Sequence, residues 1–214
     1  MTNDLMTISL TNTGKRYNRE WIFRRFSYQF EQGKKYAITG PNGSGKSTLL
    51  QVIAGATLHN EGTIEYRQPE SGTLGTLADT QHYKYLSIAA PYLELIEEMT
   101  AREMLSFHAG FKPFLPDADI SSILETVGLK AATNKQIRYY SSGMKQRLKL
   151  AQAFFSDTPA LLLDEPTTNL DADGIALYLT LISRYTKDRL VIVSSNVKQE
   201  YDFCEEVIAI SSYK

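Results

Sequence analysis

The stretch Gly40-Pro-Asn-Gly-Ser-Gly-Lys-Ser47 decides the fold, because it matches the phosphate-loop pattern G-x-x-x-x-G-K-[ST]. A β-rich run, KKYAIT, precedes it and a helical run, LLQVIAG, follows it, which is the context that the motif requires. Glycines let the backbone approach a triphosphate, and the N–H groups at the helix start bind its oxygens. The predicted nucleotide-binding residues are Gly40, Pro41, Asn42, Gly43, Ser44, Gly45, Lys46, Ser47 and Thr48.

Four side chains in two motifs predict the chemistry of the site. Lys46 is expected to reach the β- and γ-phosphates, and Ser47 to bind Mg²⁺. In the second motif, LLLDEPTTNLD, an apolar strand over residues 160–163 ends at Asp164, a second candidate ligand of Mg²⁺. Glu165 follows directly, where it can polarise an attacking water. The sequence therefore predicts a site that binds ATP and Mg²⁺.

The order of elements predicts an α/β fold with a mostly parallel, phosphate-loop (RecA-like) sheet, an antiparallel β part and a small helical insert. Residues 21–40 are expected to form a hairpin that turns at Gln32-Gly33, and QPESGTLGTLADTQ to be a surface loop. A capping box, Thr100-Ala-Arg-Glu103, begins a helical insert over approximately residues 100–156. Asp171 is expected to cap a later helix.

Composition limits the classes of protein that the chain can belong to. The 214 residues fit one domain, 1–214, and 23 basic side chains balance 24 acidic ones, so no nucleic-acid partner is expected. No apolar run reaches the length of a membrane span, and the N-terminus lacks the pattern of a signal peptide. One cysteine, Cys204, excludes an internal disulfide. These features favour a cytoplasmic protein.

A third motif, YYSSGMKQRLKLAQA, separates the families that share a phosphate loop. With it, the chain resembles the ATP-binding subunits of ABC transporters over nearly all of its length. The resemblance implies that Tyr17 stacks on adenine, and that Ser141, Ser142 and Gly143 bind the ATP of an opposite protomer. It also implies a head-to-tail dimer, with itself or a related chain, and a transmembrane permease at the inner face of the cell membrane. A helix N-cap is the alternative for the third motif, and packing at the surface or in the core is the alternative for Tyr17.

The chain departs from the family pattern at three places. The family's LSGGQ signature is here Tyr140-Ser-Ser-Gly-Met144, which keeps the serine and the second glycine. Pro91 stands where the family has a glutamine; together with Tyr92 it is expected to face the partner, or else to begin an acidic-faced helix. Asn196 stands where the family has a histidine, so it is expected to be a weakened γ-phosphate sensor, a helix N-cap, or both. Slow but real hydrolysis is the expected result.

Other functions compete with an ATPase subunit that drives a permease. One is a soluble ABC ATPase of an assembly system, and another is a non-hydrolysing regulatory subunit, suggested by Pro91 and Asn196. Ribosome-associated members usually carry two ATP domains, and chromosome or repair members a long coiled coil, neither of which the sequence shows. A small-molecule kinase would need a lid and has no use for the third motif. The sequence does not name a transported substrate or a direction of transport.

Overall fold

The strands of the protein form two sheets in the computed structural model, which describes residues 5–70, 73–76 and 81–214. A four-stranded sheet has the order β2-β1-β4-β5, and a five-stranded sheet has the order β6-β7-β8-β3-β9. The strands are β1 Thr7–Tyr17, β2 Glu20–Glu31, β3 Lys35–Thr39, β4 Glu61–Glu70, β5 Thr73–Thr76, β6 Leu86–Ala89, β7 Ala160–Asp164, β8 Leu190–Ser194 and β9 Glu206–Ala209. The first sheet pairs in antiparallel fashion and the second in parallel fashion.

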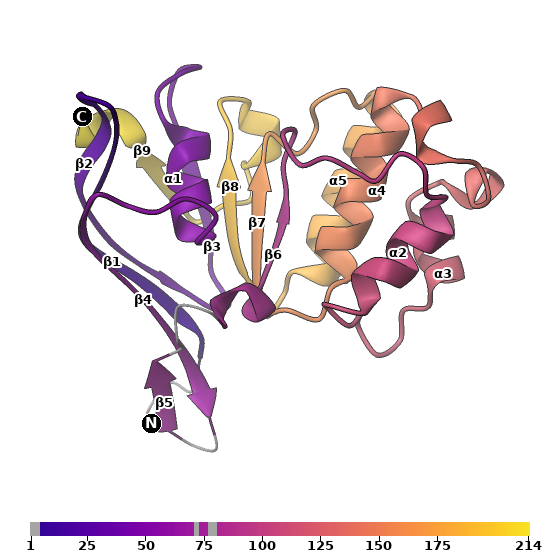
Figure 1. Ribbon diagram of the computed structural model, residues 1–214, viewed down its shortest axis with the longest axis horizontal. Helices are drawn as coiled ribbons and strands as arrows, with labels where there is room; N and C mark the ends of the chain where they lie inside the picture. The colour runs from indigo at the N-terminus through magenta and orange to yellow at the C-terminus, as the bar shows by residue number, and fades with distance from the viewer. Residues whose placement is uncertain (1–4, 71–72, 77–80) are drawn as a thin grey trace.

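Helices lie on both sides of the parallel sheet (Figure 1). The α-helices are α1 Lys46–Ile53, α2 Ala101–Ala109, α3 Ile120–Thr126, α4 Ser142–Phe155 and α5 Ala172–Tyr185. Short 3-10 helices are η1 His82–Tyr85, η2 Lys130–Ala132, η3 Ile137–Tyr139, η4 Lys198–Glu200 and η5 Ile210–Tyr213. Helix α1 lies on the side of the antiparallel sheet, and α2 to α5 cover the other side. The predicted α/β architecture is confirmed.

The parallel sheet divides the buried core into two clusters, because alternate residues of a strand point to opposite faces. On β7, Ala160 and Leu162 pack with α1 and the antiparallel sheet, whereas Leu161 and Leu163 pack with the helices on the other face. All five residues of β7 are buried, as are all five of β8. Strands covered on both faces need such continuous apolar runs.

Local signals placed the helices correctly. Thr100 and Glu103 form the predicted capping box of α2, and the Asp171 carboxylate accepts a hydrogen bond from the Gly174 N–H at the start of α5. Three α-helices lie between residues 101 and 155, within the predicted range of the helical insert. The domain limits themselves stay a prediction.

Two predictions about strands were wrong. A turn does lie at Gln32-Gly33, but the strands on either side of it, β2 and β3, do not pair as a hairpin. Instead β2 pairs with β1, and β3 lies in the parallel sheet between β8 and β9. Three consecutive buried residues, Tyr36 to Ile38, require partners on both edges and cover on both faces. The predicted surface loop is also partly strand, because residues 68–70 and 73–76 pair in β4 and β5. The rest of that predicted loop lies largely outside the described residues.

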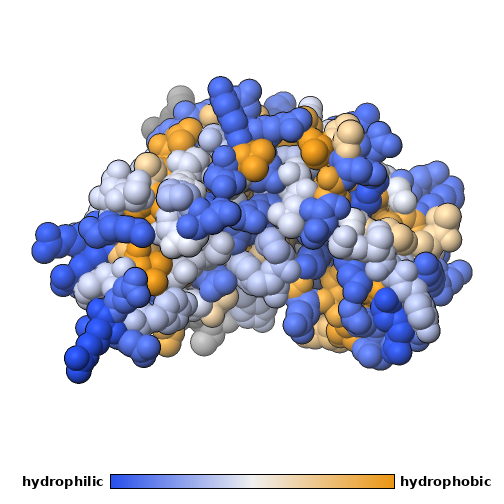
Figure 2. Space-filling model, turned by 90° about the horizontal axis from the view of Figure 1, so that it is seen from above, coloured by the Kyte–Doolittle hydropathy of each residue, from blue (hydrophilic) through white to orange (hydrophobic). Residues whose placement is uncertain are grey.

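No helix among the described residues is both long and apolar enough to span a membrane. The face in Figure 2 is mostly hydrophilic, with hydrophobic residues in separate patches.

Candidate functional site

The phosphate loop joins the end of β3 to the start of α1, as predicted. Its last glycine, Gly45, has φ 104°, a conformation that side chains with a Cβ rarely adopt. A Cβ at this position would lie 2.5 Å from Cγ2 of Ile22, so the close approach of β2 also requires glycine. The loop and the first turn of α1 line one pocket.

Lys46 is buried and folds back over the loop. Its Nζ donates hydrogen bonds to the carbonyl oxygens of Gly40, at 2.9 Å, and Pro41, at 3.2 Å. These bonds hold the ammonium group above the loop backbone. One of its three donors remains for a phosphate oxygen.

The phosphate loop and Glu165 line the same pocket, a cavity of about 200 Å³. Residues 42–48 form most of the wall, and Ile22 completes it. The structure therefore brings Glu165, which lies more than a hundred positions later in the sequence, to the loop. Sequence spacing alone could not show this contact.

Asp164 is a buried carboxylate whose two oxygens form no hydrogen bond of good geometry with the described residues, although the Ser194 and Ser47 hydroxyls and the Lys46 charge act on it. Only 1% of the residue is exposed. Burial raises the pKa of Asp164 above its ordinary value, and the nearby hydroxyls of Ser194 and Ser47 partly oppose that shift. Native proteins rarely leave a buried carboxylate uncompensated, so the geometry fits a cation here.

The donor set suits Mg²⁺ rather than a metal held by protein side chains alone. No group of three or more His, Cys, Asp or Glu side chains suited to a metal occurs in the described ranges. Asp164 and the hydroxyl of Ser47 supply oxygen donors instead. Mg²⁺ is typically bound by one or two carboxylates together with phosphate oxygens and water. The residues present therefore fit this ion.

Glu165 is held in a strained backbone conformation. Its φ is 42°, which is rare for a residue other than glycine and costs on the order of 1–3 kcal/mol. The backbone N–H of Glu165 donates to the carbonyl oxygen of Ser194, at 2.9 Å. Two residues on, the carboxylate of buried Glu200 accepts hydrogen bonds from the N–H and hydroxyl of Thr167. These bonds fix the loop that carries Glu165; the sequence analysis missed Glu200.

Asn196 does not line the phosphate-loop pocket itself, but it is bonded to a residue that does. Its side-chain Nδ2 donates to Oδ1 of Asn42 in the phosphate loop, at 2.9 Å. The N-cap alternative was wrong, because the residue before the short helix η4 is Val197, and that helix has no side-chain cap. The sensor role is untested and stays a prediction.

Tyr17 is not among the residues that line the phosphate-loop pocket. It ends β1 with 48% of its surface exposed, and the Lys15 ammonium lies 4.7 Å from its ring centre. The exposure excludes core packing. Stacking on adenine stays a prediction.

The segment around Pro91 is a turn followed by irregular chain, so the prediction of a helix beginning there was wrong. Pro91 follows the end of β6, and its carbonyl oxygen accepts a hydrogen bond from Nζ of Lys149, at 2.9 Å. Next to it, partial burial and then the charge of Asp164 raise the pKa of Tyr92 to about 12, while the amide of Gln51 opposes the shift. The charge of Asp164 thus acts on the Tyr92 phenol, whereas the sequence analysis assigned Tyr92 only to a partner surface.

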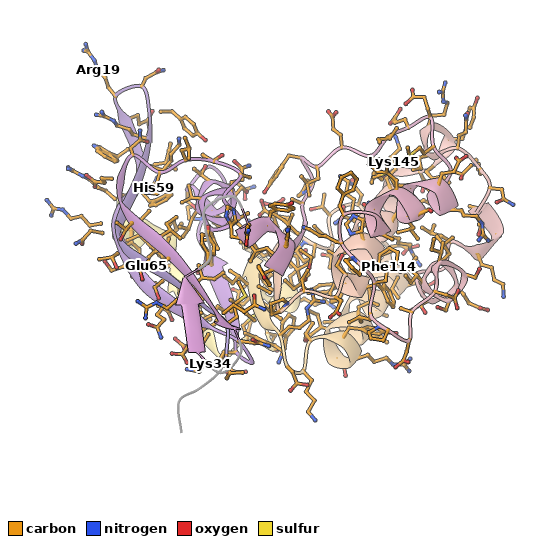
Figure 3. The ribbon with its side chains drawn as sticks, turned by 60° about the horizontal axis from the view of Figure 1, so that its bottom comes forward. Arg19, Lys34, His59, Glu65, Phe114 and Lys145 are labelled. Carbon is orange, nitrogen blue, oxygen red and sulfur yellow. The ribbon has the colours of Figure 1, made fainter. Side chains whose placement is uncertain are left out.

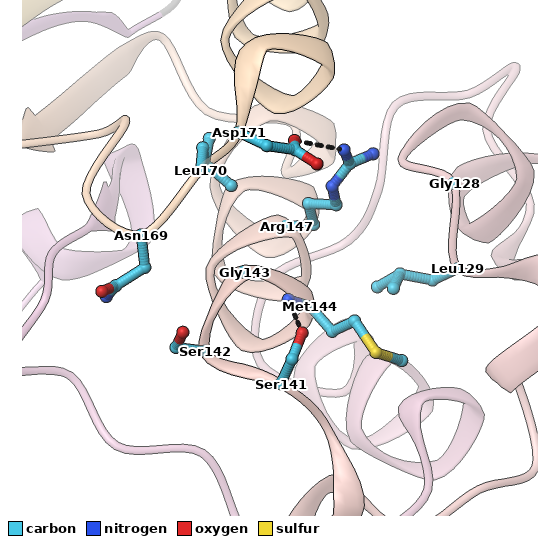
Figure 4. A pocket seen from close by; sticks show the side chains of 10 residues that line it. All are labelled: Gly128, Leu129, Ser141, Ser142, Gly143, Met144, Arg147, Asn169, Leu170 and Asp171. Atoms are coloured by element: carbon cyan, nitrogen blue, oxygen red, sulfur yellow. Dashed lines mark hydrogen bonds and ion pairs between the residues drawn. The ribbon is translucent and has the colours of Figure 1, made fainter.

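A second pocket surrounds the Ser-Ser-Gly motif (Figure 4). Ser141 caps α4, because its Oγ accepts a hydrogen bond from the Met144 N–H at 3.2 Å. The N-cap alternative for this motif is confirmed, and the binding of a partner's ATP by Ser141 stays a prediction. A Cβ on Gly143 would lie 3.0 Å from the Asn169 carbonyl oxygen, so this position has little room.

The two pockets are separate, but the loop of residues 165–171 contributes lining residues to both of them. The second cavity, of about 450 Å³, is lined by residues of the motif and by Asn169, Leu170 and Asp171, and it shares no residue with the first. Nε2 of Gln146 donates to the Pro166 carbonyl oxygen at 2.8 Å, joining α4 to the loop that begins with Glu165. No sequence pattern indicated this role of Gln146.

The fold and the first pocket define a phosphate-loop nucleotide-binding protein. The chain belongs to the ABC transporter family, whose model matches residues 23–168. It is 30% identical over 194 residues to an uncharacterised ABC transporter ATP-binding protein of Bacillus subtilis, YybJ, covering 90% of this chain and 87% of that protein. The chain is thus an ATP-binding subunit of the ABC transporter type, as predicted, and its family is one of ATPases.

Two solved structures share this fold. A putative ABC transporter ATP-binding protein from Pyrococcus furiosus superposes with a TM-score of 0.79 at 20% identity, over 97% of this chain and 99% of that one. A bacterial ABC transporter cassette described as dimeric superposes with a TM-score of 0.78 at 22% identity, over 95% of each chain.

Proposed function

We propose that the chain binds ATP with Mg²⁺ in the phosphate-loop pocket, hydrolyses it within a head-to-tail dimer, and drives a separate transmembrane permease. The observation that carries this proposal is the buried Asp164 carboxylate, which forms no hydrogen bond of good geometry with the described residues and lies near the Ser47 hydroxyl. A buried charge of this kind needs a cation. The phosphate loop beside it supports a nucleotide as the source of the remaining ligands.

Each residue of the pocket has a distinct task in this mechanism. Backbone N–H groups of the loop and Nζ of Lys46 hold the β- and γ-phosphates. Asp164 and Ser47 would hold Mg²⁺, which would supply positive charge to offset the charge on the transferring phosphate. Glu165 accepts a hydrogen bond from the attacking water and aligns it with the γ-phosphate. Asn196 donates its amide N–H to the γ-phosphate, in place of its bond to Asn42.

The separation of the two pockets supports the dimer. Ser141, Ser142 and Gly143 line a cavity that shares no residue with the phosphate-loop pocket. In a head-to-tail pair, the motif of one chain covers the ATP of the other, and two symmetry-related sites form at once. Helix α4 then points its positive N-terminal end at the phosphates. The partner is a second copy or a related chain.

Mg²⁺-dependent ATP turnover of the purified chain, run beside Glu165→Gln, tests the mechanism. We expect slow turnover that needs Mg²⁺ and falls by at least about 10²-fold in the mutant, because the water loses its base. A matched control is Glu205→Gln, an exposed position. Turnover that persists in Glu165→Gln would contradict the assigned role. ATP binding without turnover in either protein would favour a non-hydrolysing regulatory subunit.

In the proposed complex, binding to the permease holds the protein at the cytoplasmic face of the cell membrane. The family supports this partner, and the loop of Pro91 and Tyr92 is the proposed contact. A soluble assembly system is the alternative. Purification with a protein that spans the membrane several times separates the two.

A further inference from the structure

The segment of residues 194–200 holds the loop of Glu165 at two points. The carbonyl oxygen of Ser194 accepts the backbone N–H of Glu165 at 2.9 Å. Oε1 of Glu200 accepts both the backbone N–H of Thr167, at 2.8 Å, and the hydroxyl of the same residue. The segment therefore fixes the backbone at Glu165 and again two residues beyond it.

The Glu200 carboxylate is itself held in place by the fold. Only 3% of the residue is exposed, and its carbonyl oxygen accepts the hydroxyl of Tyr178, a buried residue of α5, at 2.7 Å. Its N–H donates to the carbonyl oxygen of Val197 at 3.0 Å, and the N–H of Ser195 donates to that of Ile38 in β3 at 3.1 Å. The segment is thus anchored on a helix and on a central strand, so the carboxylate has a fixed position.

Glu165 needs such support because its backbone is strained. Its φ of 42° is rare for a residue other than glycine, and such a conformation persists only where the surrounding structure imposes it. From α4, Nε2 of Gln146 donates to the carbonyl oxygen of Pro166. Figure 3 labels the adjacent Lys145 on the helical half of the molecule. Glu200 and Gln146 thus hold the two residues that follow Glu165.

Glu200 does not line the phosphate-loop pocket, whereas Glu165 does. Any effect of Glu200 on the reaction therefore passes through the loop that it holds. A general base must lie within hydrogen-bond reach of the proton that it accepts. A displacement of about 1 Å in a catalytic group can cost about 10²-fold in rate. The bonds from Glu200 to Thr167 are thus in a position to decide how well Glu165 works.

We propose that Glu200 is a positioning residue for ATP hydrolysis. Through Thr167 it holds the backbone of Glu165 in the conformation that aims the Glu165 carboxylate at the attacking water. Without this bond the loop relaxes, and the strained φ of Glu165 returns toward ordinary values. This inference rests on the proposed function and adds a buried residue outside the pocket to its mechanism.

Steady-state kinetics of Glu200→Leu give the first test. We expect kcat with Mg²⁺-ATP to fall about tenfold or more, because the loop of Glu165 loses its acceptor. The dissociation constant for ATP, measured by titration calorimetry, should stay close to that of the wild type. Glu200→Gln keeps an acceptor oxygen for both donors and should recover most of the kcat. Glu205→Leu, the same substitution at an exposed position, is the matched control.

The Glu165→Gln background separates positioning from a general loss of folded protein. If Glu200 acts through the Glu165 carboxylate, Glu200→Leu should cause little further fall in the residual turnover of Glu165→Gln. A variant that is only less folded would lower turnover by the same factor in both backgrounds. Thr167→Val removes the hydroxyl but keeps the backbone N–H, so we expect a smaller fall in kcat than in Glu200→Leu. It carries the same comparison if Glu200→Leu does not fold.

The outcomes distinguish failure of the inference from failure of the proposed function. A kcat of Glu200→Leu equal to that of the wild type, or an equal loss in the wild-type and Glu165→Gln backgrounds, would overturn the positioning role while leaving hydrolysis in place. If the wild-type chain binds ATP but shows no Mg²⁺-dependent turnover, the proposed hydrolysis falls, and the inference falls with it.

Discussion

Asn196 is hydrogen-bonded to Asn42, which is one of the residues that line the phosphate-loop pocket. The bond holds the amide of Asn196 beside the phosphate loop. An amide can donate one such bond but carries no charge. The position therefore suits the sensor role, and the residue type limits its strength.

We expect Asn196→His to raise ATP turnover, because an imidazole is longer and can carry a positive charge toward the transferring phosphate. The kcat of both proteins at saturating ATP and Mg²⁺ is the measurement, with Asn134→His, an exposed position, as the control. A kcat that is unchanged or lower would show that the pocket is adapted to asparagine.

Asp164→Asn should stabilise the chain in the absence of Mg²⁺ and nucleotide. Removing an uncompensated buried charge should add about 1–2 kcal/mol to the free energy of unfolding near pH 7. For a chain of this size that is roughly 2–4 °C in melting temperature for each kcal/mol. Melting curves with and without Mg²⁺-ATP measure both effects, and the mutant should lose the shift caused by Mg²⁺-ATP.

The pH dependence of this difference follows from the raised pKa of Asp164. The protonated acid contributes stability that is fully present below the unfolded-state pKa, about 3.9, and is lost as the pH rises through the folded-state value. The difference in the free energy of unfolding between the wild type and Asp164→Asn should therefore become smaller as the pH falls toward 4. A difference that becomes larger would contradict the burial of a charged Asp164.

At the scale of elements, helix α4 connects the two pockets. Its N-terminus lines the second pocket, and Gln146, one turn later, holds the Pro166 carbonyl oxygen in the loop that follows Glu165. Lys149, on the same helix, holds the loop of Pro91. A movement of α4 would thus reach both the catalytic loop and the proposed permease contact.

Gln146→Leu should lower the free energy of unfolding by about 1–3 kcal/mol, because a buried carbonyl group loses its donor. It should also lower kcat more than ATP affinity, since Gln146 lies outside the phosphate-loop pocket. Denaturant unfolding and steady-state kinetics measure the two effects, and Gln199→Leu, on the surface, is the control. An equal loss of ATP affinity would indicate general misfolding instead.

Local sequence signals predicted where helices begin, but they did not predict which strands pair with each other. The capping box at Thr100 and the cap at Asp171 act through neighbouring residues, so the sequence predicts both helix starts. The partners of β3 lie more than 150 positions away, on β8 and β9, and nothing near Gln32-Gly33 indicates them. Gln146 and Lys149 bind backbone carbonyl groups of distant loops, which carry no sequence signature.

On the scale of the whole molecule, one chain holds two unlike halves of a nucleotide site. The phosphate loop and Glu165 line one cavity, and the Ser-Ser-Gly motif lines another. In the dimer that we propose, two chains arranged head to tail would complete both sites, whereas a single chain would complete neither.

Light scattering on Glu165→Gln tests this account most directly, because the mutant binds ATP but hydrolyses it slowly. With ATP and Mg²⁺ we expect a mass of twice the 24.1 kDa of one chain, falling to one chain when ATP is removed or when Lys46→Ala is added. Ser141→Ala should weaken the dimer but not ATP binding. A mutant that binds ATP and stays monomeric, alone and with its related chain, would contradict the sandwich.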